Sequence, residues 1–364
     1  MISKYQKIIF SIFMMFTCLA NAGNFNDSVF SNLDYGLYWA GADKQFEKAG
    51  SDTKNGSTYY DPTKPTLIYV HGWQSDSVSE LHRESFYESG DGWPEGEDMA
   101  NKWISAGYNI GIIYWNQFAD ESEVKDAEAK IWSMEGDQKM RWLDNNGTYH
   151  YNDADKPVAE LILANYIEAM SNYKGDDLRI IGHSLGSQVA MRLTKLLIDS
   201  ANDGKINDNL VPARVSILDA YFSNGSKDYL DGEWVGEAVR DIADTLIANG
   251  IAIDSYRTST ASSSIFVGDE NKALHNKLAF VEQSTSYFWT WEQAKKHRAA
   301  VWLYLWSIEY SSPEVNNDSS SAVSAAASNE LVIKWMNANK HVKQASGGYS
   351  KDPSDDIYKL TERL

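Results

Sequence analysis

The chain is almost without cysteine. Its 364 residues include one, Cys18, and that residue falls in an N-terminal stretch that we expect to be removed. A mature chain without thiols has no disulfides, no thiolate nucleophile and no thiolate metal ligand. We therefore expect the packing of ordinary side chains to hold the fold together.

Positive charge is also scarce. The chain has 33 Lys and Arg residues against 51 Asp and Glu residues, which gives a formal net charge of −18. Nucleic-acid phosphates and anionic bilayers would repel such a protein, so we predict no nucleic-acid partner. A transient contact with a lipid interface stays open, and the sequence does not give the oligomeric state.

A membrane-spanning run is missing from the N-terminus. The apolar stretch at residues 8–20 is too short to span a bilayer comfortably, and it lies between a basic start and an A-x-A cleavage pattern that ends at Ala22. We predict that residues 1–22 are a signal peptide cleaved near Ala22. The mature protein would then be secreted, to the outside of the cell or to a periplasm; an uncleaved anchor is the alternative.

Strand-like apolar runs alternate with amphipathic helical patterns through residues 23–364, without an internal repeat or a marked break in composition. This alternation predicts an α/β fold with a mainly parallel central sheet and helices on both faces. We expect a single domain with insertions at about 116–155 and 223–290 and a peripheral C-terminal helix. The expected strands are 66–70, 109–115, 213–218, 250–256 and 277–281, and the expected helices are 97–106, 157–173, 234–248, 292–309 and 330–342.

One G-x-S-x-G pattern, Gly182-His-Ser-Leu-Gly186, joins an apolar strand to an amphipathic helix. A serine on so sharp a turn projects its hydroxyl beyond the sheet edge, and the two glycines are needed because neighbouring backbone passes close by. The pattern predicts Ser184 as a nucleophile and the N–H of Leu185, at the start of the helix, as an oxyanion donor. An ordinary strand-to-helix turn is the alternative for the pentapeptide taken alone.

A serine nucleophile needs a histidine base, and the base needs a carboxylate that orients it. Asp219 follows the apolar strand 213–218, at the sheet edge where such sites form, and is the predicted acid. The alternatives are a turn-capping role for Asp219 and Asp254 as the acid. Because Asp254 lies inside a strand, its side chain more readily points to a flank.

His297, at the start of a Trp- and Tyr-rich helix, is the predicted base. His275 is the rival, and His341 is expected on the surface at the end of the last helix. His183 points sideways from the nucleophile turn, so a packing or substrate contact suits it better. His71 is expected to have a structural role at a backbone corner.

The second oxyanion donor should come from the turn after the strand 66–70. Gly72 permits a sharp turn there, and the N–H of Trp73 would face the same edge as the N–H of Leu185. The indole of Trp73 can pack in the core at the same time, because the side chain and the amide point in different directions.

Four segments together resemble the α/β-hydrolase lipases, nearest the pancreatic-lipase-like branch: 70–73, 182–186, 218–220 and 297–304. The resemblance covers roughly residues 64–305. It implies the α/β-hydrolase fold, with Ser184 as nucleophile, Asp219 as acid, His297 as base, and Trp73 and Leu185 as oxyanion donors. The mature chain lacks the cysteines of that branch's disulfide-bound lid.

The combined interpretation is a secreted serine hydrolase of carboxylic esters, similar to a lipase or phospholipase, that works through an acyl-enzyme. This scheme needs no metal and no other cofactor. Peptidases, thioesterases and polyester or cell-wall esterases share the constellation, and a catalytically silent binding protein of the same fold is a hypothesis of another class. Aromatic residues in 283–293 would either wall an acyl pocket or pack in the core.

Overall fold

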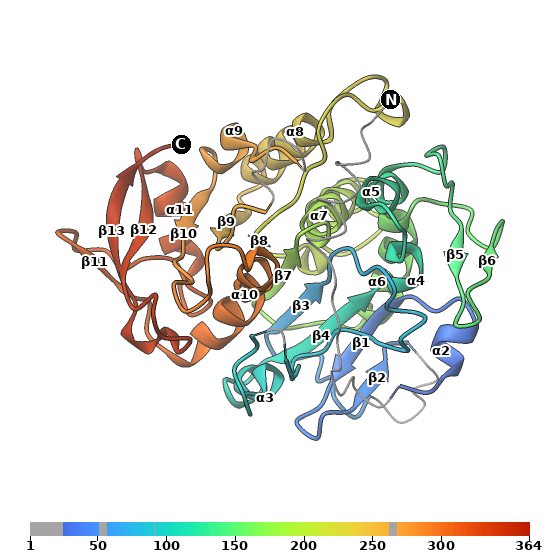
Figure 1. Ribbon diagram of the computed structural model, residues 1–364, viewed down its shortest axis with the longest axis horizontal. Helices are drawn as coiled ribbons and strands as arrows, with labels where there is room; N and C mark the ends of the chain where they lie inside the picture. The colour runs from blue at the N-terminus through green and yellow to red at the C-terminus, as the bar shows by residue number, and fades with distance from the viewer. Residues whose placement is uncertain (1–24, 51–56, 91, 262–267) are drawn as a thin grey trace.

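The computed structural model describes residues 25–50, 57–90, 92–261 and 268–364. The expected signal peptide and Cys18 lie outside these residues. One sheet of eleven strands runs through the described part of the chain, in the order β11-β13-β12-β10-β9-β8-β7-β3-β4-β1-β2. Figure 1 shows its C-terminal strands on one side of the molecule and its N-terminal strands on the other.

The centre of the sheet is parallel, as the sequence predicts. Neighbouring strands from β4 through β3, β7, β8, β9 and β10 to β12 all pair in parallel. Every residue of β3 is buried, as expected where helices cover both faces of a sheet. The bounds of these strands are β3 (Thr66–Val70), β4 (Asn109–Tyr114), β7 (Leu178–His183), β8 (Arg214–Leu218), β9 (Ala252–Arg257), β10 (Ala279–Glu282) and β12 (Lys340–Ser346).

Helices cover both faces of this sheet. The neighbouring helices α6, α7 and α8 lie on one face, α3 and α10 pack together on the other, and α11 packs on β9 and β10. Apolar residues recur along α7 at helical spacing and are buried. The bounds are α3 (Met99–Ser105), α6 (Val158–Ala169), α7 (Gly186–Asn202), α8 (Val235–Ala248), α9 (Lys272–His275), α10 (Gln293–Trp306) and α11 (Asn329–Asn337).

The N-terminal hairpin extends the sheet. After the short helix α2 (Ser28–Ser31), β1 (Gly36–Ala40) and β2 (Phe46–Lys48) form an antiparallel pair, and β1 is also antiparallel to β4. This hairpin therefore forms an edge of the central sheet. All five residues of β1 are buried, because α6 packs against it.

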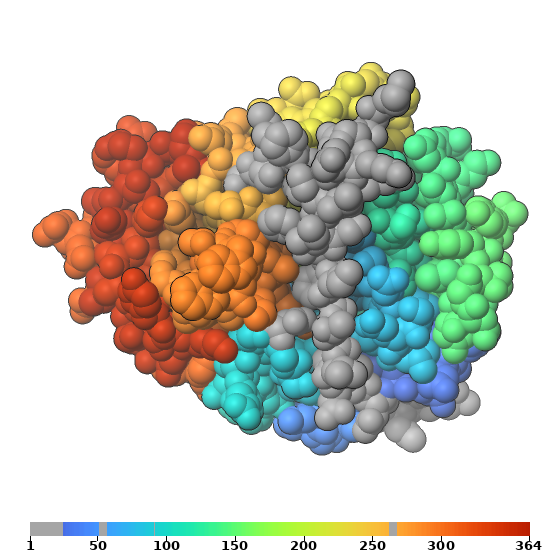
Figure 2. All heavy atoms as spheres, in the orientation of Figure 1, coloured from blue at the N-terminus to red at the C-terminus, as the bar shows by residue number. Residues whose placement is uncertain are grey.

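The C-terminal region differs from the expectation of one helix over 330–342. Helix α11 ends at Asn337, and the chain continues into β12 and then β13 (Ile357–Glu362), with the short β11 (Glu314–Asn316) beyond it. Residues 340–346 form a strand that pairs with β10 on one side and β13 on the other. Buried and exposed residues alternate along much of it, as is typical of a strand with one covered face. These elements form the orange and red side of the molecule in Figure 2.

The insertion at 116–155 has ordered secondary structure. It contains α4 (Asn116–Ala119), α5 (Val124–Trp132) and a two-stranded hairpin of β5 (Trp142–Leu143) and β6 (Tyr149–His150). In the part of the chain that is described, we find no helix with the length and apolar character needed to cross a membrane.

Candidate active site

The turn between β7 and α7 holds Ser184 in a strained conformation. Its φ is +54°, in the left-handed region that residues other than glycine rarely adopt. A Cβ on Gly182 would lie 2.2 Å from the carbonyl oxygen of Gly186, and a Cβ on Gly186 would lie 2.2 Å from the carbonyl oxygen of Val70. Both glycines are thus required by the close approach of backbone, as the G-x-S-x-G pattern predicts.

Asp219 lies beside this turn, at the carboxyl end of β8. The amide of Ser184 donates to the carbonyl oxygen of Leu218 at 3.0 Å, so the serine turn is hydrogen-bonded to the strand end. Asp219 has a φ of +42°, and its amide donates to the carbonyl oxygen of Tyr256 on β9 at 2.8 Å. This backbone conformation sets the direction of a carboxylate that is buried.

Two side chains and one backbone amide donate hydrogen bonds to the carboxylate of Asp219. Nδ1–H of His297 donates to Oδ2 of Asp219 at 2.7 Å, and the hydroxyl of Ser259 and the amide of Thr258, at 3.4 Å, also donate to it. The hydroxyl of Thr258 donates to the carbonyl oxygen of Lys296 at 2.6 Å, which fixes α10 one residue before His297. Nε2 of His297 keeps the lone pair that a general base needs.

Thr258 and Ser259 were not anticipated from the sequence. They directly follow β9, at the edge where parallel sheets gather polar sites, and this position was the available signal. Only the tertiary structure shows that their donors point at Asp219.

His297 also lies next to the serine turn. The ring centroids of His183 and His297 are 4.4 Å apart, and Nε2–H of His183 donates to the carbonyl oxygen of His297 at 3.1 Å. His183 therefore has the packing contact expected of it. Among the described residues no hydrogen bond joins the hydroxyl of Ser184 to the His297 ring. Catalytic hydrogen bonds often tighten only when substrate binds.

The turn after β3 packs against Ser184 from the other side. A Cβ on Gly72 would lie 2.8 Å from the Cβ of Ser184 and 3.4 Å from its Oγ. The amides of Trp73 and Leu185 have no acceptor within the described part of the chain, and both residues adjoin this contact. Two free N–H groups beside a serine hydroxyl are what stabilisation of an oxyanion requires.

The rival acid is placed elsewhere. Asp254 is fully buried in an ion pair with Arg214, whose Nη2 and Nε lie 2.5 and 3.1 Å from its oxygens. The hydroxyls of Ser216 and Tyr256 also donate to it. Its side chain thus points to the flank of the sheet, as its place inside β9 suggests.

The other histidines are held in hydrogen bonds or in the core. Nδ1 of His275 lies 2.9 Å from the hydroxyl of Ser255, and burial lowers the pKa of His275 to about 3. The expectation of a surface His341 is wrong. It lies on β12 with 1 % of its surface exposed, because the chain forms a strand where a helix end was expected.

His71 has the structural role that was expected. Its Nδ1–H donates to the carbonyl oxygen of Gly72 at 2.8 Å, and its Nε2 accepts from the amide of Trp115 at 3.1 Å. This pattern requires the neutral ring, and burial lowers the pKa of His71 to about 3. The ring joins the end of β3 to the end of β4.

The two expected insertions meet at a pocket of about 160 Å³. One wall comes from the start of α5 and the other from the segment after β8. The amide of Tyr221, in that second wall, donates to the carbonyl oxygen of Ser184 at 3.4 Å. This hydrogen bond joins the second wall to the serine turn, but Ser184, Asp219 and His297 do not line the pocket. Its lining residues are Glu123, Val124, Lys125, Tyr221, Ser223, Asn224 and Lys227.

The aromatic residues before His297 divide between core and surface. Phe288 is buried, whereas Trp289 and Trp291 are 66 % and 71 % exposed. The two indoles stack on each other, with centroids 5.1 Å apart and an interplanar angle of 3°. Neither tryptophan is among the lining residues of the pocket described above. Within the described residues, no group of three or more His, Cys, Asp or Glu side chains could hold a metal ion.

No family model matches the chain, and no curated protein matches it. Solved structures that are similar include the fluorophosphonate-binding serine hydrolase F of Staphylococcus aureus, at 14 % identity over 69 % of this chain and 88 % of that chain, with a TM-score of 0.34. A lipase-esterase related protein from Clostridium acetobutylicum matches at 11 % identity over 67 % and 86 %, with a TM-score of 0.29.

Similarity at this level carries no argument about reaction or substrate. The strand order, the antiparallel β1 and the serine turn between β7 and α7 define the class: the chain has the α/β-hydrolase fold.

Proposed function

We propose that the protein is a serine hydrolase of carboxylic esters. In this scheme Ser184 attacks the ester carbonyl, and Nε2 of His297 takes the hydroxyl proton and delivers it to the leaving alcohol. Water then attacks the acyl-enzyme, Nε2 of His297 takes its proton and returns it to Oγ of Ser184, and the carboxylic acid is released. Asp219 stabilises the imidazolium, and the N–H groups of Trp73 and Leu185 bind the oxyanion.

The observation that carries this proposal is the 2.7 Å hydrogen bond from Nδ1 of His297 to Asp219, formed beside a strained serine turn. A fluorophosphonate probe tests it directly, because the probe reacts only with an activated serine. We expect labelling and hydrolysis of 4-nitrophenyl acetate, both lost in Ser184→Ala. A folded wild-type protein that neither reacts nor turns over would favour a silent binding protein of the same fold.

We further propose an acyl ester of a lipid as the substrate class, which agrees with the resemblance to the pancreatic-lipase-like branch. The stacked and exposed Trp289 and Trp291 support it, because indoles favour the boundary between water and lipid. We expect replacement of both tryptophans by alanine to reduce binding to phosphatidylcholine vesicles. Tyr349→Ala, which removes another exposed aromatic side chain, is the matched control.

A series of 4-nitrophenyl esters tests the acyl group. A lipid ester predicts that kcat/KM rises with chain length, and no preference beyond short acyl groups would remove the lipid hypothesis. We also propose secretion after cleavage near Ala22. The molecular mass of the protein recovered outside the cytoplasm would test it, because cleavage near Ala22 removes the N-terminal residues.

A further inference from the structure

The loop after β3, residues 71–78, carries the amide of Trp73 but contains no helix or strand. Catalysis needs this amide in a fixed position, since a displacement of about 1 Å in an active site can reduce the rate 100-fold. The neighbouring segment 115–121, from the end of β4 through α4, holds the loop at several points.

Asp120 binds the far end of the loop. Its Oδ1 accepts from the amide of Asp76 at 2.7 Å, and its Oδ2 accepts from the amide of Val78 at 2.9 Å. The side chain is buried, and burial raises the pKa of Asp120 to about 6, so the carboxylate is ionised at pH 8. Hydrogen bonds to a charged acceptor are stronger than neutral ones.

Glu121 binds the near end of the loop. Its carbonyl oxygen accepts from the indole Nε1–H of Trp73 at 2.7 Å. Its own carboxylate is fully buried between Lys130, at 2.6 Å, and Arg141, whose Nε and Nη2 lie 2.8 and 2.6 Å away. This ion triad fixes the backbone of residue 121 and, through it, the indole of Trp73.

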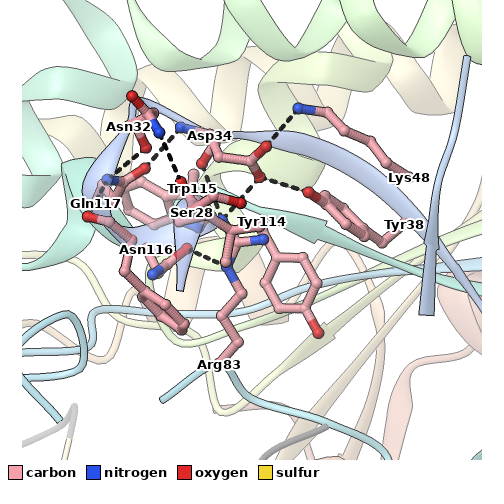
Figure 3. A network of polar contacts seen from close by, with 12 residues as sticks. Ser28, Asn32, Asp34, Tyr38, Lys48, Arg83, Tyr114, Trp115, Asn116 and Gln117 are labelled. Atoms are coloured by element: carbon pink, nitrogen blue, oxygen red, sulfur yellow. Dashed lines mark hydrogen bonds and ion pairs between the residues drawn. The ribbon is translucent and has the colours of Figure 1, made fainter. Parts of the chain in front are cut away.

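Helix α4 is anchored in turn to the N-terminal part of the fold, as Figure 3 shows. Nε of the buried Arg83 donates to the side-chain oxygen of Asn116 at 3.1 Å, and the side-chain oxygen of Gln117 accepts from the amide of Asp34 at 2.7 Å. Arg83 and Asp34 are also paired with each other, at 2.9 Å, so one connected network holds the segment that holds the loop.

We propose that Asp120 and Glu121 are positioning residues for the oxyanion donor: they fasten the 71–78 loop at both ends and so hold the amide of Trp73 against the serine turn. This inference rests on the proposed ester hydrolase function. It assigns a purpose to the first part of the 116–155 insertion.

Asp120→Asn is the test, because the amide replaces one acceptor oxygen with a donor and one of the two loop bonds is lost. Asp144→Asn is the matched control. Asp144 lies in the same insertion and also accepts two backbone amides, from Asn146 and Thr148 at 2.8 and 2.9 Å, but both bind Oδ1. Its Oδ2 lies 2.8 Å from Nε2 of His150, and it does not touch the loop. With 4-nitrophenyl acetate at pH 8 we expect Asp120→Asn to lower kcat at least about tenfold, with KM changed less than about threefold.

A second measurement separates positioning from loss of folding. Phenylboronic acid forms a tetrahedral adduct whose oxygen occupies the oxyanion site, so its Ki should rise in Asp120→Asn by the same factor as kcat/KM falls. Trp73→Phe, which keeps the backbone amide but loses the bond to Glu121 and part of the packing of the indole, should show the same pattern. If Asp120→Asn does not fold, Trp73→Phe alone decides.

The first measurement is whether the wild-type protein hydrolyses the ester and whether Ser184→Ala removes this activity. If no such activity is found, the proposed function itself is contradicted. Given that turnover, equal kcat values in Asp120→Asn and Asp144→Asn would overturn the positioning role. A rise in KM at unchanged kcat would overturn it as well.

Discussion

The two candidate acids have different surroundings: Asp219 directly follows β8, and Asp254 lies within the neighbouring β9. Asp219 accepts from His297 and from the polar pair after β9, whereas Asp254 neutralises Arg214 in the core. The first arrangement orients a base, and the second stabilises the packing of the sheet. Replacement by asparagine should therefore lower the catalytic rate at Asp219 and the stability at Asp254.

For Asp219→Asn we expect kcat to fall about 10³- to 10⁴-fold with stability nearly unchanged, because the wrong tautomer of His297 is favoured. For Asp254→Asn we expect the free energy of unfolding to fall by about 3 kcal/mol, because the charge of Arg214 is left uncompensated. The kcat of the folded fraction should stay within a few-fold of the wild-type value. Urea denaturation and steady-state kinetics on both variants check this. The reverse pattern would assign the acid to Asp254.

His71 gives a prediction on pH. The unfolded histidine has a pKa near 6.5, whereas burial and the amide of Trp115 keep the folded ring neutral with a pKa of about 3. Between these values only the unfolded chain binds the proton, so stability is lost as the pH falls through 6.5, by up to about 1.4 kcal/mol per pH unit.

In His71→Asn this contribution is absent, while the donor to the carbonyl oxygen of Gly72 can be kept. The difference in the free energy of unfolding between wild type and variant should therefore shrink as the pH is lowered from 7 to 5. Urea denaturation at several pH values measures it. A constant difference would mean that the pKa of His71 is the same in the folded and unfolded chain, and a difference that grows would mean that the folded ring is ionised.

At the scale of the secondary-structure elements, the β7–α7 unit depends on Gly186. Gly186 begins α7 where the helix passes the carbonyl oxygens of Val70 and His71, which a Cβ would approach to 2.2 and 2.5 Å. These are backbone atoms at the end of β3, so they cannot move aside as a flexible side chain would.

We expect Gly186→Ala to lower the free energy of unfolding by about 3 kcal/mol and to abolish labelling of Ser184. Gly204→Ala is the control: its φ is +69°, but a Cβ there would meet nothing within 4 Å, so only the left-handed backbone costs about 1 kcal/mol. Similar losses in the two variants would show that close approach at Gly186 is not limiting.

Across the whole molecule, the sheet continues past β10 through β12 to β13 and β11. β10 is buried along most of its length and would become an edge strand without β12. Exposed apolar edges favour aggregation. This extension therefore covers the edge of the parallel part of the sheet, in which β7 and β8 lead to Ser184 and Asp219.

A chain ended after Asn337 should consequently have a lower Tm and a lower soluble yield than the full chain. A chain ended after Glu362, which keeps both β12 and β13, serves as the control. Thermal unfolding and the soluble fraction after expression check the expectation. Equal Tm values for the two truncated chains would show that the C-terminal strands are dispensable.

Local patterns in the sequence carried much of this structure. Hydrophobic periodicity and the steric demands of a sharp turn depend on a few consecutive residues. They predict the parallel sheet, the turn at Ser184, Asp219 at a strand end and His297 near the start of a helix. The strands β12 and β13 were missed because their neighbours in the sheet lie far away along the chain.

The remaining features depend on contacts between distant segments. The sequence alone determined which residue types stand at the sheet edge, since strand ends and glycine positions are local. Only the tertiary structure decided which of them meet: Thr258 and Ser259 with Asp219, Arg214 with Asp254, and Asp120 and Glu121 with the loop of Trp73. Hydrogen bonds act over about 3 Å, and the register that brings such groups within that distance is set by the packing of the whole sheet.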